Sequence, residues 1–101
     1  MTLDEYEQAA ARTLNPKISD NERLMDAAAG LAEEAGEVLG HVRKFIYQNR
    51  ALDKSELQQE LGDALWNVAM AARCAGLSLE QIAATNVAKL TARFPEGYVD
   101  R

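Results

Sequence analysis

Apolar residues recur every three or four positions along two long stretches of the chain, which is the period of a helix with one apolar face. The first stripe is Leu24, Ala28, Leu31, Ala35, Val38, Leu39, Val42, Phe45 and Ile46. The second is Leu57, Leu61, Ala64, Leu65, Val68, Ala71, Ala72 and Ala75. No window shows convincing alternation of apolar and polar residues, the mark of a half-buried strand. The pattern predicts an all-α protein.

Capping residues indicate where the helices begin and end. A Ser or Thr followed three residues later by Glu or Gln forms the capping-box pattern. It occurs at Thr2–Glu5, Ser19–Glu22, Ser55–Gln58 and Ser78–Gln81, and Asp53–Glu56 is an acidic variant that leaves the third start open by two residues. Breakers follow at Asn15-Pro16, Gly76 and Pro95. We expect helices near residues 3–13, 20–48, 55–75 and 79–93.

The connection between the second and third helices has about six residues, which makes these helices antiparallel neighbours. A chain of 101 residues can bury one core but not two. We therefore expect residues 1–101 to form one domain with a four-helix bundle-like protomer.

Two features favour a homo-oligomer. Trp66, Ala69 and Met70 lie largely off the main stripe of the third helix, so that helix is apolar on more than one side. The second helix carries three glycines, at Gly30, Gly36 and Gly40. Each costs roughly 1 kcal/mol relative to alanine inside a helix, which close approach by another helix would explain. A single thick core is the alternative.

The charge of the chain bears on its partners. With 16 acidic and 11 basic residues the net charge is −5 and no basic stripe exists, so we expect no binding of nucleic acid. No apolar run approaches the roughly 18–20 residues of a membrane span, and the acidic start MTLDEYEQ lacks the pattern of a secretory signal. The single Cys74 cannot form an internal disulfide, which favours the cytoplasm.

Two pairs of carboxylates lie at the edges of the apolar stripes. Residues placed about 100° apart around each axis put Glu34 and Glu37 at one edge of the second helix, and Glu60 and Asp63 at the corresponding edge of the third. Glu33 points nearly away from the stripe. Like charges at this spacing repel each other, and partial burial increases the cost.

A divalent cation would compensate these four acids. No Lys or Arg lies between Arg23 and Arg43, or between Lys54 and Arg73. Carboxylates without thiolates or a histidine cluster favour Mg²⁺ or Mn²⁺ over zinc. Di-iron bundles use Glu-x-x-His pairs, which the chain lacks, and we take His41 as a helix-surface residue. Ordinary solvated charges are the alternative.

The same acids form a recognisable signature. Glu33-Glu34-x-x-Glu37, followed after 22 residues by Glu60-x-x-Asp63, resembles the EExxE…ExxD motif of the MazG-like nucleotide pyrophosphohydrolases. The similarity covers most of residues 24–98 and includes the runs GLAEEAGEV, ELGDALWNVA and SLEQIAATNVAKLTARFPEGY. The last run matches the family's Asn-x-x-Lys-x-x-x-Arg-x-Pro segment at Asn86, Lys89, Arg93 and Pro95.

This resemblance implies hydrolysis of nucleoside triphosphates to the monophosphate and pyrophosphate by an all-α protein, active as a homodimer or homotetramer. The implied Mg²⁺ ligands are Glu34, Glu37, Glu60 and Asp63. Glu33 would assist at an additional ion or orient the attacking water. Lys89 and Arg93 would reach the phosphates, and Asn86 would contact the sugar or a phosphate. Cleaning of the nucleotide pool is the expected role.

Recognition of the base is open. Trp66 and Asn67 could stack on a base and hydrogen-bond to it, and Trp66 is at least as well suited to packing at an interface. Within enzymes, the alternatives are a relative directed at dUTP, dCTP or phosphoribosyl-ATP, although the RFPEGY tail fits MazG-like proteins better. A non-catalytic helical interaction module is the alternative from another class.

Overall fold

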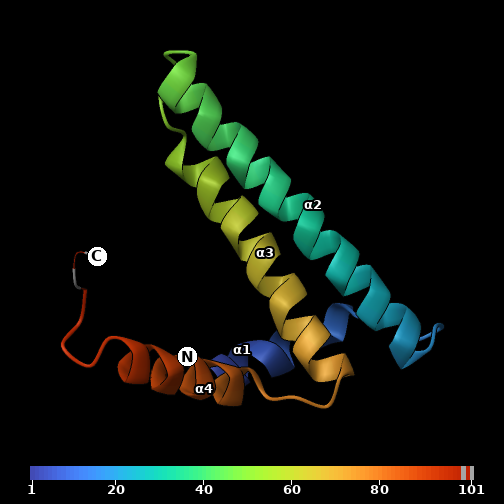
Figure 1. The fold of residues 1–101 in the computed structure, drawn as a ribbon. Helices are drawn as coiled ribbons and strands as arrows, with labels where there is room; N and C mark the ends of the chain where they lie inside the picture. Colours follow the sequence, from blue (N-terminus) through green and yellow to red (C-terminus); the bar gives the residue numbers. More distant parts are fainter. Residues whose placement is uncertain (99, 101) are drawn as a thin grey trace.

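Four α-helices make up most of the computed structural model, which describes residues 1–98 and residue 100 (Figure 1). They are α1 (Leu3–Ala10), α2 (Asp20–Tyr47), α3 (Lys54–Cys74) and α4 (Leu79–Arg93), and the 3₁₀ turn η1 (Ala11–Thr13) extends α1. No strand occurs in this described part of the chain. The predicted all-α class is confirmed, and the predicted helix bounds agree closely with the observed ones. Every described helix is too short or too polar to span a bilayer.

The capping residues fix where each helix begins. Thr2 and Ser19 form complete capping boxes with the glutamates three residues further on, and the cap of α4 is the predicted serine. The third helix is capped by Asp53, whose Oδ1 accepts the N–H of Glu56 at 3.0 Å. Of the two predicted starts for α3, the structure therefore has Asp53 rather than Ser55 as the cap.

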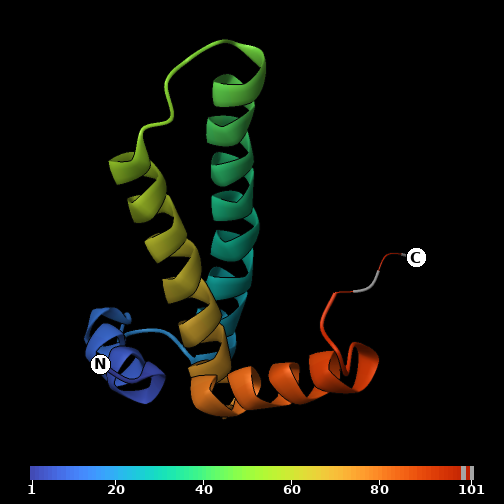
Figure 2. The ribbon, with the colours of Figure 1, turned by 90° about the vertical axis from the view of Figure 1, so that its left-hand side faces the viewer.

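Helices α2 and α3 form an antiparallel hairpin, as the short connection predicts (Figure 1, Figure 2). The chain reverses over residues 48–53, where Asn49 adopts a positive φ of 51°. Asparagine tolerates this left-handed conformation better than most residues do. The hairpin carries both of the predicted carboxylate pairs.

The buried core lies at one end of the hairpin, where α1 crosses α3 and α4 begins (Figure 2). Its buried members are Ala27, Ala69, Met70 and Leu79, and the side chains packed against them include Leu3, Tyr6, Leu14 and Trp66. Trp66 Nε1 donates to Thr13 Oγ1 at 2.8 Å, and Glu7 Oε1 accepts the N–H of Leu79 at 3.1 Å. These hydrogen bonds join α1 and η1 to the helices that they cover.

This core gives another reason for features that suggested a partner chain. Ala69 and Met70 are buried in it and Trp66 packs against it, so α1 covers the second apolar side of α3 within the same chain. Gly30 faces the side chain of Asn67 on α3, which accounts for the missing side chain there. These four residues therefore do not argue for an oligomer.

Helix α4 leads away from the hairpin, and its main contacts are with α1 and α3 (Figure 1, Figure 2). The radius of gyration is 16.3 Å, whereas a compact chain of this length has about 13 Å. The four helices of one chain thus do not close into a bundle, and the protomer differs in this from the predicted bundle-like form.

Much of the predicted core face of the hairpin is exposed. On α2 the exposed fractions are 59% for Leu39 and 57% for Ile46, and on α3 they are 51% for Leu61 and 39% for Leu65. The accessible surface is 7703 Å² for a chain of 11.1 kDa, about 2,000 Å² more than a compact monomer of this mass exposes. The expectation that these stripes are buried holds at the core end of α3, where Ala72 is buried and Val68 and Ala71 pack against the core. It is wrong for much of the rest of both stripes in the single chain.

The stripes are exposed because the helices meet along other faces. Residues of α2 that lie toward α3 include Ala27, Gly30 and His41. On a helical wheel the apolar stripe of each helix lies about a quarter turn from its contact line. Viewed from the N-terminus of its own helix, each stripe is turned in the same direction from the contact line. Because the helices are antiparallel, the two stripes therefore lie on the same side of the hairpin. That side is apolar and uncovered.

Asp53→Ala should lower the free energy of unfolding by about 1 kcal/mol, because the first turn of α3 loses the acceptor for the Glu56 N–H. Ser55→Ala is the matched control, and it should stay within about 0.5 kcal/mol of the wild type. Urea denaturation followed by circular dichroism measures both. A larger loss in Ser55→Ala than in Asp53→Ala would assign the cap to Ser55.

Candidate functional site

The predicted carboxylates face one another across α2 and α3 in successive layers. Each helical turn forward along α2 corresponds to a turn back along α3, because the two helices are antiparallel. Four pairs of residues oppose each other, as side-chain contacts, electrostatic interactions and a shared cleft show. They are Gly30 with Asn67, Glu34 with Asp63, Glu37 with Glu60, and His41 with Glu56. Two acidic layers therefore stand between a neutral layer and a histidine-containing one.

Glu34 shows the cost of this arrangement. Its Oε2 is buried and has no hydrogen-bond partner among the described residues. Burial raises the pKa of Glu34, and the negative charges of Glu37 and Asp63 raise it further. The ionised form of this carboxyl is therefore disfavoured in the folded chain without a bound cation.

Glu60 has a second buried oxygen of the same kind. Its side chain is 14% exposed, and its Oε2 also has no partner in the described part of the chain. Its Oε1 lies 3.8 Å from His41 Nδ1, and that nitrogen is 3.9 Å from Glu56 Oε2. These three residues could offer a metal three ligand atoms within 4.8 Å of one another. Together with Glu37, Gly40 and Lys44, they line a cleft of about 250 Å³.

The environments of His41 and Tyr6 differ from what the sequence suggested. His41 was expected on the helix surface, but its side chain is only 12% exposed. It lies along the contact line between α2 and α3, which we call the seam. The sequence could have indicated this position, because His41 follows Glu37 by four residues and that spacing returns to the same face of the helix. Tyr6 comes from the N-terminal segment, to which the resemblance gives little weight. Burial raises the pKa of Tyr6, and the charge of Asp63 adds to the effect, so α1 reaches the edge of the site.

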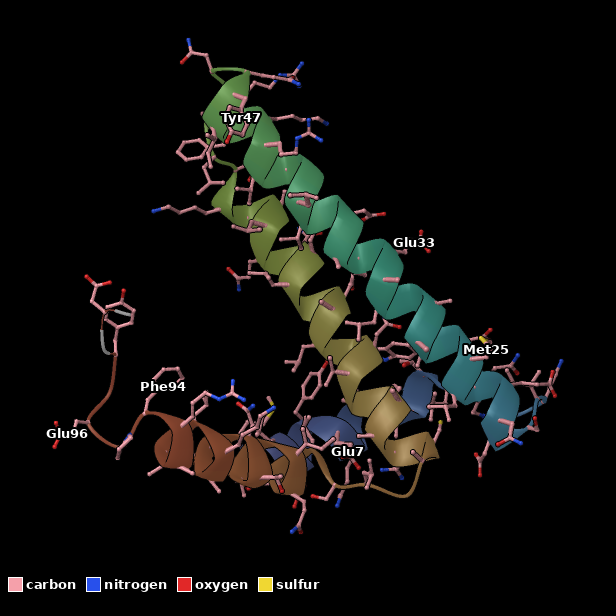
Figure 3. All side chains as sticks on the ribbon, in the orientation of Figure 1. Glu7, Met25, Glu33, Tyr47, Phe94 and Glu96 are labelled. Carbon is pink, nitrogen blue, oxygen red and sulfur yellow. The ribbon has the colours of Figure 1, made fainter. Side chains whose placement is uncertain are left out.

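Three other predicted site residues lie near these acids but in different surroundings. Glu33 is exposed and points away from α3 into solvent (Figure 3). Asn67 is 7% exposed, and its Nδ2 donates to the backbone oxygen of Asp63 at 2.9 Å. Trp66 is half-buried and donates to Thr13. The contacts of Asn67 and Trp66 are thus within the chain, and their roles toward a base stay predictions.

The predicted phosphate-binding residues lie apart from the carboxylates. Asn86, Lys89 and Arg93 are exposed on α4, which leads away from the hairpin (Figure 1). Asn86 and Lys89 line a groove of about 420 Å³ with Thr85 and Ile82 of the same helix. Within one chain, the acidic and basic parts of the predicted site are therefore not brought together.

The four carboxylates are chemically suited to a divalent cation. None of them forms an ion pair with a Lys or Arg in the described residues. Two buried oxygens, on Glu34 and Glu60, accept no hydrogen bond there. Hard cations such as Mg²⁺ and Mn²⁺ prefer carboxylate oxygens, and their charge would relieve the repulsion between the acids.

Glu34→Gln should raise the melting temperature of the metal-free protein at neutral pH. The folded state raises the pKa of Glu34 above its unfolded value, so the folded state binds the proton more tightly. Stability therefore falls as the pH rises from about 4.3 through the folded-state pKa, and it stays lower above that pKa. Glutamine removes the charge, so its advantage should shrink toward about pH 4.

Scanning calorimetry in chelator across this pH range measures the effect. Asp26→Asn, an equivalent change at an exposed position of α2, should leave the melting temperature nearly unchanged. A metal-free Glu34→Gln protein that is less stable than the wild type at neutral pH would contradict the proposed repulsion.

Comparisons with known proteins bear on this site. Residues 23–98 match the family model of the MazG nucleotide pyrophosphohydrolase domain. The chain is 32% identical to the Gene 37 protein of Mycobacterium phage L5 over 107 residues, which cover 98% of this chain and 94% of that protein. It is 38% identical over 73 residues to the uncharacterized protein YvdC of Bacillus subtilis strain 168, covering 63% of this chain and 69% of that one. No solved structure matches the chain.

The family match spans the whole hairpin from Arg23 onward as well as α4, so it includes every predicted carboxylate and the predicted basic residues. It confirms the resemblance that the acidic signature indicated. The chain belongs to the MazG nucleotide pyrophosphohydrolase family.

Proposed function

We propose that this protein hydrolyses ribo- or deoxynucleoside triphosphates to the monophosphate and pyrophosphate in a Mg²⁺-dependent reaction. The observation that carries the proposal is the pair of opposed acidic layers, Glu34 with Asp63 and Glu37 with Glu60, without a Lys or Arg partner in the described chain. An acidic site suits a polyanionic substrate only if cations bridge the two. A role in cleaning the cytoplasmic nucleotide pool would follow.

These four carboxylates would hold Mg²⁺, with Mn²⁺ as a possible substitute. The buried, unpartnered oxygens of Glu34 and Glu60 support this assignment, because they are the donors that such an ion uses. When bound, the ion would supply charge neutralisation on the phosphates and a lowered pKa for a coordinated water. Glu33, which precedes Glu34 and faces solvent on α2, would orient the attacking water or bind an additional ion.

The remaining residues would bind the substrate. Lys89 and Arg93, four residues apart on α4, would neutralise phosphate oxygens, and Asn86 would contact the sugar or a phosphate. Trp66 and Asn67 are the predicted contacts to the base. Hydrolysis between the α- and β-phosphates needs an in-line water and little covalent participation by the protein, so these residues would act by position and charge.

We also propose that the active form is a homodimer or a homotetramer. The apolar side shared by α2 and α3, including Leu31, Leu39, Leu61 and Leu65, is exposed in the single chain. The excess surface of about 2,000 Å² is more than the roughly 800 Å² per partner that a stable interface buries. A second copy is the occupant that fits, because it brings an identical apolar side and can cover both at once.

A second copy would also account for the position of α4. This helix carries Lys89 and Arg93 away from the carboxylates of its own chain (Figure 1, Figure 2). Their phosphate-binding role therefore calls for the acidic layers of another copy. The exposed apolar residues Val87 and Leu90 on α4 support docking of that helix on a neighbour.

The reaction is tested by pyrophosphate release from a panel of ribo- and deoxynucleoside triphosphates, with Mg²⁺ and with chelator. We expect Mg²⁺-dependent release together with the monophosphate, and the rank order identifies the substrate class, including dUTP and dCTP. Phosphoribosyl-ATP belongs in the panel as the related substrate. No release and no binding of Mg²⁺ or Mn²⁺ would sink the proposal and favour an interaction module.

Glu37→Gln and Asp63→Asn should each abolish turnover while leaving the helical content unchanged, because each removes one ligand charge from a different acidic layer. Glu80→Gln is the control, since it alters an exposed acid at the start of α4. Circular dichroism checks the helices of all three. Full activity in either Glu37→Gln or Asp63→Asn would remove that residue from the mechanism.

Light scattering coupled to gel filtration should show a dimer or a tetramer at micromolar concentration. Leu61→Glu, which places a charge on the exposed apolar side, should shift the protein toward the monomer because burying an unpaired charge is costly. Glu80→Gln again serves as the control. A wild-type monomer across the micromolar range would overturn the oligomer.

A further inference from the structure

The absence of a side chain at Gly30 on α2 makes room for Asn67 on α3. A methyl group at Gly30 would lie 2.4 Å from Asn67 Oδ1 and 2.9 Å from its Cγ, which is closer than real atoms approach. Methyl groups at the other helical glycines, Gly36, Gly40 and Gly62, would meet nothing within 4 Å. Among the helical glycines of the described chain, Gly30 alone is required by a neighbouring helix.

The amide of Asn67 is held in this space. Its Nδ2 donates to the backbone oxygen of Asp63 at 2.9 Å, and the residue is only 7% exposed. Its Oδ1 lies against the backbone of Gly30. An amide that swings away from this position loses that hydrogen bond and leaves a buried donor without a partner, which is unfavourable. Asn67 is therefore a fixed spacer between the two helices.

The spacer lies one helical turn from the acids. Glu34 follows Gly30 by four residues, and Asp63 precedes Asn67 by four. Because α2 and α3 are antiparallel, both steps lead in the same direction along the hairpin. The hydrogen bond of Asn67 ends on the backbone oxygen of Asp63 within α3. The packing of its Oδ1 against Gly30 reaches α2, the helix that carries the opposing Glu34.

We propose that Asn67, seated on Gly30, is a positioning residue that sets the spacing and the register of the two carboxylate layers. Repulsion between the opposed acids pushes α2 and α3 apart at this level. A bound ion needs its ligands placed within about 0.5 Å, so the spacing must be fixed before the ion arrives. This inference rests on the proposed function, because the register matters to the chemistry only if the layers hold an ion.

Titration of the purified protein with Mn²⁺, followed by electron paramagnetic resonance, tests the inference. Gly30→Ala and Asn67→Ala should each weaken Mn²⁺ affinity roughly tenfold or more, the usual effect of losing a residue that orients metal ligands. The double variant Gly30→Ala with Asn67→Ala refills the vacated space with a methyl group. We expect its affinity to return to within about threefold of the wild type, a gain that independent sites would not show.

Gly36→Ala is the matched control, because it adds the same methyl group to the same helix in open space. It should leave Mn²⁺ affinity unchanged. Circular dichroism and the melting temperature separate misfolding from misplacement, and Asn67→Ala, which adds no atoms, carries the test if Gly30→Ala fails to fold.

The outcomes separate the two proposals. Wild-type affinity in a folded Asn67→Ala protein, even with a lower melting temperature, would reduce the contact to ordinary packing and overturn this inference alone. A double variant no better than the single ones would also overturn it. Absence of Mn²⁺ binding in the wild type would overturn the proposed function and this inference with it.

Discussion

The repulsion between the acids that α2 and α3 turn toward each other is the interaction on which the rest of the structure depends. Two apolar stripes would pack together more favourably than this seam does. Instead the helices meet through Gly30, Glu34 and His41 on one side and their acidic or amide partners on the other. The seam is therefore stabilised from outside itself, by the capped helix ends and by the core at one end of the hairpin.

A hairpin whose two helices meet along acidic faces exposes its apolar stripes on another side. Rotating the acids into the contact line turns Leu61 and Leu65 of α3, and the matching stripe of α2, to one exposed side. The same geometry that makes a cation site possible therefore also makes an apolar surface available. The proposed site and the proposed oligomer are then two consequences of one choice of helix face, because a second copy would supply the burial that the acidic seam lacks.

The sequence predicts those parts of the structure that local physics determines. Caps such as Ser19 and the loop length between α2 and α3 were sufficient for the helices and their antiparallel pairing, because these depend on near neighbours. The spacing of Glu34 and Glu37, and of Glu60 and Asp63, predicted that the acids share facing edges. What periodicity cannot provide is which side of an amphipathic helix meets which partner. The stripe containing Leu39 was therefore expected to be buried, and the burial of His41 was missed. The roles assigned to Lys89 and Arg93 stay predictions, since a single chain does not bring them to the acids.

The distribution of packing along the hairpin suits a binding site. The core that joins α1, α3 and α4 holds the hairpin at the end that contains Ala27 and Met70. Glu37, Glu60 and His41 lie farther from this core along α2 and α3. In that part of the hairpin the two helices are covered by no other described helix (Figure 1, Figure 2). Charges placed inside that core would have to displace apolar contacts, whereas charges placed beyond it cost their own desolvation and their mutual repulsion. A cation that removes the repulsion then stabilises the folded chain by the amount that its binding contributes.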